Sequence, residues 1–176
     1  RQPHGLDRAA LAAVSLELRD HLVEHGQRRS PFDTAGARTH GVGVAHCPSS
    51  NMRLGAGIAP VRQLLDAGVP VGLGVDGSAS NERGDLFLEV KQALLVARAR
   101  GGPAALSVRD AVRLGTRGGA AVLGREDLGQ LAVGKRAYFA VWRIDGLELG
   151  GASDPVAGLV FAGPHRVDRL YVSGEE

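Results

Sequence analysis

Hydrophobic residues recur along this chain in two patterns, one typical of helices and one typical of buried strands. From residue 6 to 25 they stand three and four positions apart, which predicts an amphipathic helix. The polar stretch 26–39, with Gly and Pro, predicts a loop. The sequences GVGVAHC at 41–47 and VPVGLGVD at 69–76 are short and apolar, and the second is uninterrupted. They predict buried strands, the second of the parallel kind.

Helical patterns follow each predicted strand. The segment 58–68 predicts a short helix, and 86–101 and 106–124 predict two more. Ser107 and Asp110 have the S-x-x-D spacing that satisfies free amides at the start of the last one. Strands therefore alternate with helices, which is typical of an α/β protein with a parallel sheet or barrel.

The pattern changes near Arg125. From LGQLAVGKRAYFAVWRID (128–145) onward it predicts short strands and Gly turns with no helix. We therefore place a domain boundary there, between a segment at 41–125 and a segment at 126–176.

Composition narrows the class of protein. The chain has 176 residues, 44% of them hydrophobic, and a net charge of +2 from 21 basic and 19 acidic residues, which predicts a globular fold. Because the charged residues are scattered and aromatic residues are few, we expect no nucleic-acid partner. No stretch of apolar residues is long enough to span a bilayer, so we expect no membrane partner either. Cys47 is the only cysteine, so no intramolecular disulfide forms and we expect a cytoplasmic location.

Gly72, Gly74 and Gly77 spell G-x-G-x-x-G, the pattern of a dinucleotide-binding turn. Asp76 would then place a carboxylate against a pyrophosphate, and the next helical pattern begins only near residue 85. In the alternative interpretation, the glycines let a strand pass through a crowded interior, and Asp76 ends that strand as a metal ligand or as a loop-capping side chain.

The stretch VAHCPSSNMRLGAGIAPVRQLLDAGVPVGLGVDGSASN resembles, almost residue for residue, the last two barrel strands of the metal-dependent amidohydrolase superfamily. Within this superfamily, the sequence of the stretch is most similar to the branch of 8-oxoguanine and guanine deaminases, adenosylhomocysteine-type deaminases and triazine hydrolases. The resemblance covers roughly residues 41–172. It implies a partial (β/α)8 TIM barrel, its last strands and helices, followed by part of a small β-sandwich.

The resemblance also implies roles for single residues. Asp76 matches the aspartate that holds one divalent metal ion, zinc, and relays a proton from the hydrolytic water. His46 matches a histidine that lines the substrate pocket, and Ser80 is a further substrate contact. Each has a structural alternative: an Asx turn, a buried hydrogen-bonding histidine and a loop serine. Asn51 is expected in a turn, and Cys47 as a small filler rather than a nucleophile.

The family's remaining metal ligands are not found. No His-x-His occurs, and His21 with Glu24 has the H-x-x-E spacing but lies in a helical pattern too close to His46. His25 stays unassigned. Residues 1–40 do not resemble the family and are expected to be a divergent segment of helix and loop. Because a barrel takes about 250 residues and the sequence starts at Arg1, we expect part of a longer protein.

We therefore expect the chain to be a fragment of a zinc-dependent hydrolase that deaminates a small purine-like heterocycle. The favoured substrate is 8-oxoguanine. Related guanine, adenosylhomocysteine-type or triazine hydrolases are the alternatives within the family. A non-catalytic partial-barrel domain is the alternative of another class. Without the His-x-His ligands the isolated chain should be inactive, and its open sheet edges predict a homo-oligomer or self-association.

Overall fold

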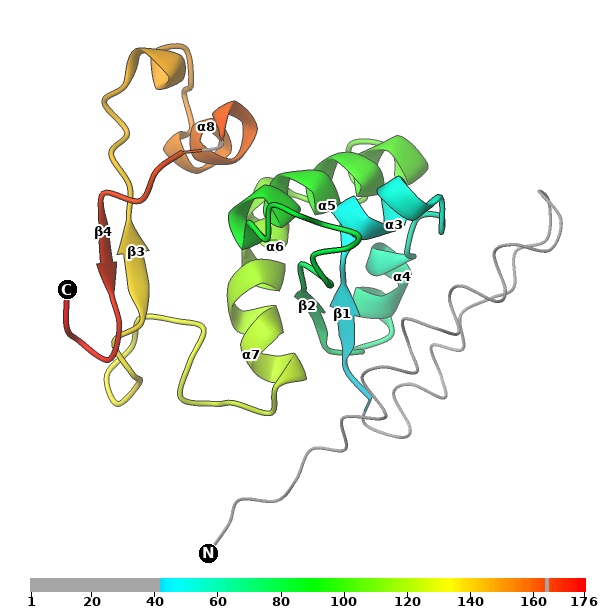
Figure 1. Cartoon of the computed structure of the whole chain (residues 1–176), viewed down its shortest axis with the longest axis horizontal. Helices are drawn as coiled ribbons and strands as arrows, with labels where there is room; N and C mark the ends of the chain where they lie inside the picture. Colours follow the sequence, from blue (N-terminus) through cyan, green and yellow to red (C-terminus); the bar gives the residue numbers. More distant parts are fainter. Residues whose placement is uncertain (1–41, 164) are drawn as a thin grey trace, which may run out of the picture.

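The computed structural model describes residues 42–163 and 165–176 and begins with an α/β unit (Figure 1). Strand β1 (Val44–His46) pairs in parallel with β2 (Val71–Leu73), so that His46 lies beside Leu73. All three residues of β2 are buried, as its uninterrupted apolar sequence predicts. Both predicted strands and the α/β class are confirmed. Within the described residues the strands form two two-stranded sheets and no closed barrel.

Helices follow the strands in the predicted order. Helix α4 (Val61–Asp66) leads into β2, and α5 (Leu86–Gly101) and α6 (Val108–Arg113) come after it. The Ser107 hydroxyl accepts a hydrogen bond from the Asp110 amide at 3.1 Å, which confirms the predicted cap of α6. The crossover from β1 through α4 to β2 makes the parallel pairing possible.

One helix in this part was not predicted. Helix α3 (Pro48–Leu54) follows β1 directly and includes Asn51, so the expectation that Asn51 lies in a turn is wrong. Pro48 stands in the first turn, where its missing N–H costs nothing, and Gly55 ends the helix with a left-handed φ of 66°. The helix between these two residues is only seven residues long, so it is too short to show a hydrophobic periodicity in the sequence.

The helical run after Ser107 packs unusually closely on β2. It continues from α6 through a π-helical turn, η1 (Leu114–Gly118), into α7 (Gly119–Val122). A Cβ on Gly118 would lie 2.1 Å from the Val71 carbonyl oxygen, and one on Gly72 would lie 2.8 Å from the Gly119 Cα. Facing glycines thus allow the backbones of helix and strand to touch.

The hydrophobic core lies between the β1–β2 sheet and the helices that cover it. Its buried members come from β1, α4, β2, α5, α6, η1, α8 and the segments that join them, and include Val44, Leu64, Val71, Leu94, Leu106, Ala111, Leu114 and Val160. Two layers of secondary structure therefore share one core, which is the usual plan of an α/β unit.

The C-terminal part contains an antiparallel pair, β3 (Phe139–Val141) and β4 (Arg169–Tyr171). Between them lie the short 3₁₀ helix η2 (Leu147–Leu149) and helix α8 (Pro155–Ala162). The expectation of no helix after residue 125 is therefore wrong. The Asp154 carboxylate caps α8 by accepting a hydrogen bond from the Val156 amide at 3.0 Å, and Pro155 stands in its first turn.

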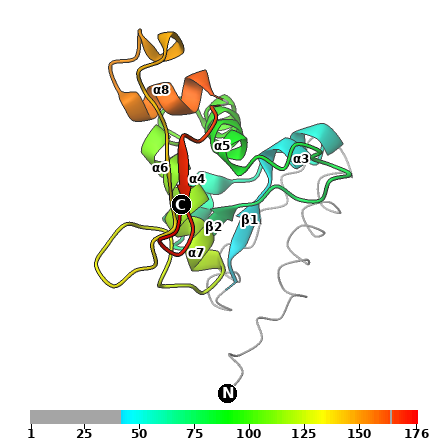
Figure 2. The ribbon, with the colours of Figure 1, turned by 60° about the vertical axis from the view of Figure 1, so that its left-hand side comes forward.

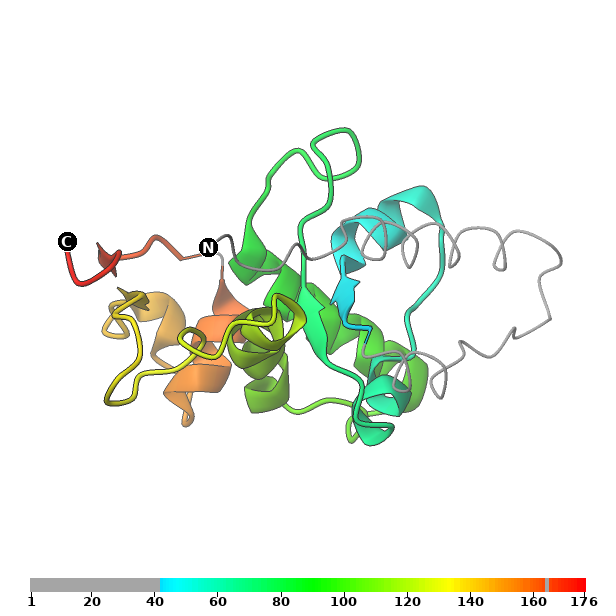
Figure 3. The same ribbon diagram turned by 90° about the horizontal axis from the view of Figure 1, so that it is seen from below.

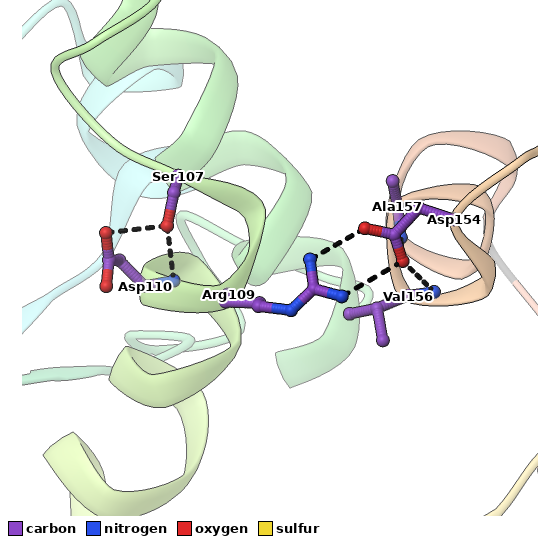
Figure 4. A network of polar contacts seen from close by, with 6 residues as sticks. All are labelled: Ser107, Arg109, Asp110, Asp154, Val156 and Ala157. Carbon is purple, nitrogen blue, oxygen red and sulfur yellow. Dashed lines mark hydrogen bonds and ion pairs between the residues drawn. The ribbon is translucent and has the colours of Figure 1, made fainter.

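Helix α8 joins the C-terminal part to the α/β unit, beside α5 and α6 (Figure 2). The Arg109 guanidinium of α6 donates to both carboxylate oxygens of Asp154, at 2.6 and 3.3 Å (Figure 4). The Lys91 ammonium of α5 donates to the Phe161 carbonyl, at the other end of α8, at 2.8 Å. Because cations complement a helix C-terminus and carboxylates an N-terminus, both contacts also suit the α8 dipole.

Several predictions fall outside the described residues, namely the helix at 6–25, the pair His21 and Glu24, and His25. Among the helices that the structure does describe, none combines the length and apolar character needed to cross a membrane.

Candidate active site

The carboxyl ends of β1 and β2 bring two polar segments together. Because the strands are parallel and in register, the chain leaves both at the same edge, and the Gly74 amide donates to the His46 carbonyl at 3.0 Å. After β1 comes α3, and after β2 comes the loop 74–85. Both lie on one side of the strands in Figure 3. In α/β proteins this edge is where ligands and catalytic residues gather.

Asp76 is exposed in the loop after β2, and two hydroxyl groups anchor its carboxylate. Ser50 Oγ, from α3, donates to Asp76 Oδ2 at 2.5 Å, and Ser80 Oγ donates to the same oxygen at 2.8 Å. The backbone of Asp76 has a φ of 62°, a left-handed conformation that Asp tolerates better than most residues and that costs about 1 kcal/mol or more. The surrounding contacts fix an otherwise unfavourable conformation.

His46 lies at the end of β1 and is only 4% exposed. Its Nδ1 is buried and has no hydrogen-bond partner in the described part of the chain. Burial lowers the pKa of the His46 imidazole to about 4, so the ring is uncharged at neutral pH. A buried ring nitrogen without a partner is costly unless another group, such as a ligand, completes it.

Two residues of this site were missed by the sequence analysis. Ser50 is 1% exposed and connects α3 to Asp76 across 26 positions of the chain. Glu89, in the first turn of α5, is 0% exposed and accepts hydrogen bonds from the Asn81 side chain and the Ser49 amide. The only sequence signal for Ser50 was its place in the HCPSSN motif, and a lone Glu in an apolar helix gave no signal at all.

Cys47 follows His46 in the sequence, but its side chain only fills space between neighbouring residues. Its thiol lies 3.8 Å from the Ala45 carbonyl, and a Cβ on Gly74 would lie 3.0 Å from the sulfur. Burial, followed by the negative charges of Asp76 and Glu89, raises the pKa of the thiol to about 11. Cys47 is thus a thiol at neutral pH and a poor nucleophile.

The glycines at the end of β2 do not form a phosphate cradle. Gly72 makes room for α7 and Gly74 for Cys47, whereas a Cβ on Gly77 would meet nothing within 4 Å. Helix α5 begins only at Leu86, with the Asp85 carboxylate at its N-terminus, so its amides are not directed at this loop. The arrangement lacks the helix N-terminus that a dinucleotide-binding turn needs.

A divalent metal would find one suitable ligand here. Asp76 offers a carboxylate oxygen at a strand end, which fits hard and borderline cations. Within residues 42–163 and 165–176, no group of three or more His, Cys, Asp or Glu side chains is arranged to hold a metal ion. A metal ion held by Asp76 would therefore need further ligands from outside the described residues.

Comparisons with known proteins point in one direction. The profile of the Amidohydrolase family matches residues 13–176. The chain is 47% identical to an 8-oxoguanine deaminase of Pseudomonas aeruginosa over 134 residues, which are 76% of this chain and 30% of that enzyme. It is 42% identical to a 5-methylthioadenosine/S-adenosylhomocysteine deaminase of Desulforudis audaxviator, covering 94% of this chain and 39% of that enzyme.

Solved structures agree. A zinc complex of an atrazine chlorohydrolase from Arthrobacter aurescens superposes with a TM-score of 0.77 at 39% identity, over 82% of this chain and 34% of that one. In each comparison the chain spans between 30 and 39% of the length of the protein it matches. The similarity thus covers most of this chain and a minority of each relative.

Proposed function

Because this chain belongs to the amidohydrolase family, we propose that it forms the C-terminal part of a metal-dependent hydrolase that deaminates a purine-like heterocycle. In this proposal residues 41–125 are the last strands and helices of a (β/α)8 barrel, and 126–176 are part of a flanking β-sandwich. Residues 1–40 form a divergent segment before them, although the family profile already matches from residue 13, which the sequence analysis did not expect. The first candidate substrate is 8-oxoguanine, because the relative of that name is 47% identical over 134 residues.

The observation that carries the proposal is the anchored carboxylate of Asp76 at the end of β2. Two serine hydroxyls hold Oδ2 from two different segments, so the group is oriented before any ligand arrives. A divalent ion, zinc in our proposal, would lower the pKa of a water molecule for attack on the ring carbon that bears the amino group. Asp76 would be one ligand of that ion and would take a proton from the water on its carboxylate.

His46 and Ser80 would bind the substrate. The His46 ring is uncharged, and its buried Nδ1 suits a hydrogen bond with a polar edge of a heterocycle. Ser80 is half-buried, and its hydroxyl already points at Asp76, so it lies where a bound ring would reach the carboxylate. Water is added and ammonia leaves, so the reaction needs no oxidant or further cofactor.

The isolated chain would be incomplete in this account. Asp76 would be one ligand, and no group of three or more possible ligands lies among the described residues, so we propose that the 176-residue chain alone neither holds zinc tightly nor turns over substrate. Large hydrophobic side chains such as Leu131, Leu147 and Leu170 are 56 to 95% exposed, which supports self-association of the chain.

The substrate is tested by measuring ammonia release in the protein that the complete reading frame encodes, loaded with zinc. We expect the largest kcat/KM with 8-oxoguanine, and smaller values with guanine and S-adenosylhomocysteine. Faster ammonia release from another amino-substituted heterocycle, including an aminotriazine, would keep the reaction class and correct the substrate. No hydrolysis of any of these compounds by zinc-loaded protein would contradict the proposal and favour a non-catalytic domain.

A further inference from the structure

Glu89 is a buried acid in the first turn of α5, and its carboxylate has no cationic partner among residues 42–163 and 165–176. Burying an unpaired charge is expensive, so natural proteins surround such groups with donors. Glu89 Oε1 accepts from Asn81 Nδ2 at 2.9 Å, and Oε2 accepts from the Ser49 amide at 3.0 Å. Both oxygens are therefore used, and both partners are neutral N–H donors.

The two donors belong to the two segments that carry the candidate site. Ser49 lies in the first turn of α3, three positions after His46. Asn81 is buried at the far end of the loop that begins after β2, five positions after Asp76. One side chain, projecting from a third element, thus connects the ends of both segments.

The start of α3 shows why this contact is needed. Cys47, at its N-cap, makes no side-chain hydrogen bond to the helix, so the amides of the first turn lack the usual local acceptor. Glu89 supplies that acceptor from another helix, and its negative charge suits the N-termini of both α3 and α5. The next residue, Ser50, then presents its hydroxyl to Asp76.

From this geometry we propose that Glu89 is a positioning residue of the site. It sets the placement of α3 against the loop 74–85, and so the placement of Ser50 and Asp76 relative to each other. Its role in turnover rests on the proposed function, while its role in holding the two segments does not.

The test exchanges the donor and acceptor groups of the Glu89–Asn81 pair. In E89Q an amide donor replaces one acceptor oxygen, so one of the two N–H partners loses its bond. In the double variant E89Q/N81D, the new side-chain amide at position 89 donates to the new carboxylate at position 81, and its oxygen still accepts from Ser49. The net charge of the pair is then the same as in the native protein.

In the zinc-loaded protein from the complete reading frame, we expect E89Q to lower kcat about 10- to 100-fold with little change in KM. The double variant should recover most of this loss. Hydrogen exchange of the Ser49 and Ser80 amides should become roughly five- to tenfold faster in E89Q and return towards the native rate in the double variant. The matched control is E126Q, which removes an exposed carboxylate that lies outside both segments.

Unchanged amide exchange in E89Q would overturn the positioning role, whatever the native protein does with substrate. A fall in kcat that only follows the unfolded fraction, measured by urea denaturation, would overturn it too. If E89Q does not fold, the variant N81A replaces it in the test, because N81A removes only the contact between the loop and Glu89. We then expect faster hydrogen exchange of the Ser80 amide. The native protein could also be inactive while E89Q still speeds up hydrogen exchange of the Ser49 amide. That pair of results would overturn the proposed deaminase function and leave the positioning role of Glu89 standing.

Discussion

At the scale of single residues, the candidate site combines an oriented carboxylate with an uncharged imidazole. Asp76 keeps a left-handed backbone and two hydroxyl contacts, and His46 is nearly inaccessible to water. Both features reduce the rearrangement that a bound substrate would require. The environment of each side chain, rather than its identity alone, suits the role that we propose for it.

The buried state of His46 makes stability depend on pH. The pKa of its imidazole is about 4 in the folded chain, against an ordinary value of 6.5, so between these pH values the unfolded chain binds the proton first. The free energy of unfolding should therefore fall as pH decreases from 6.5 towards 4, by about 2 kcal/mol at pH 4.5. Urea denaturation of the chain at pH 7.5, 5.5 and 4.5 measures it.

The variant H46Q, which cannot titrate, isolates this effect from the carboxylates. We expect native protein to lose stability relative to H46Q over that pH range. A constant difference between the two proteins would show that His46 titrates normally and is accessible to water.

The positions of residues at or near the strand ends were predictable from the sequence. Asp76, His46 and Ser80 stand at predicted strand ends or just beyond them, so their positions followed from the pattern, while their roles stay predictions. Ser50 and Glu89 were missed because Asp76 lies 26 positions after Ser50, and the Ser49 amide lies 40 positions before Glu89. The pairing of β1 with β2 brings the first two together, and the packing of α3 on α5 brings the other two together.

At the scale of elements, the contact between β2 and the run α6–η1–α7 depends on glycine. We predict that G118A destabilises the chain by about 1–3 kcal/mol, since the new Cβ would lie 2.1 Å from the Val71 carbonyl oxygen. Thermal or urea unfolding of the variant measures this change. The clash opposes the gain in helix propensity that Ala would otherwise bring.

The neighbouring variant G119A is the matched control. A Cβ there would meet only the Leu114 carbonyl oxygen at 3.9 Å, so it should be neutral or stabilise by up to about 1 kcal/mol. Equal effects of the two substitutions would contradict the close packing of helix and strand.

The long helix α5 was predicted correctly, whereas two shorter helices, α3 and α8, were missed. The 16 residues of α5 show their periodicity, whereas α3 and α8 have only 7 and 8 residues. For α8 the dipeptide Asp154–Pro155 was a usable start signal that the strand pattern of its surroundings obscured. The π-helical turn of η1 follows from tertiary packing, which no local pattern contains.

At the scale of the whole molecule, the described chain is an α/β unit with strand edges that remain open. Sheet β1–β2 has two strands, and the β3–β4 pair carries exposed hydrophobic residues such as Val141 and Leu170. Pattern and composition predicted the α/β class, but the extent of a barrel depends on partners that the described residues do not contain. The proposed function therefore concerns the protein of which these strands form the site-bearing edge.

The most direct test of that claim is the turnover number of D76N in the zinc-loaded protein from the complete reading frame, with E126Q as the control. The substitution keeps the size of the side chain and removes the proton acceptor at the end of β2. We predict that kcat for ammonia release from the best substrate falls about 10³-fold in D76N and stays near the native value in E126Q. A D76N protein that retains native turnover would contradict the account.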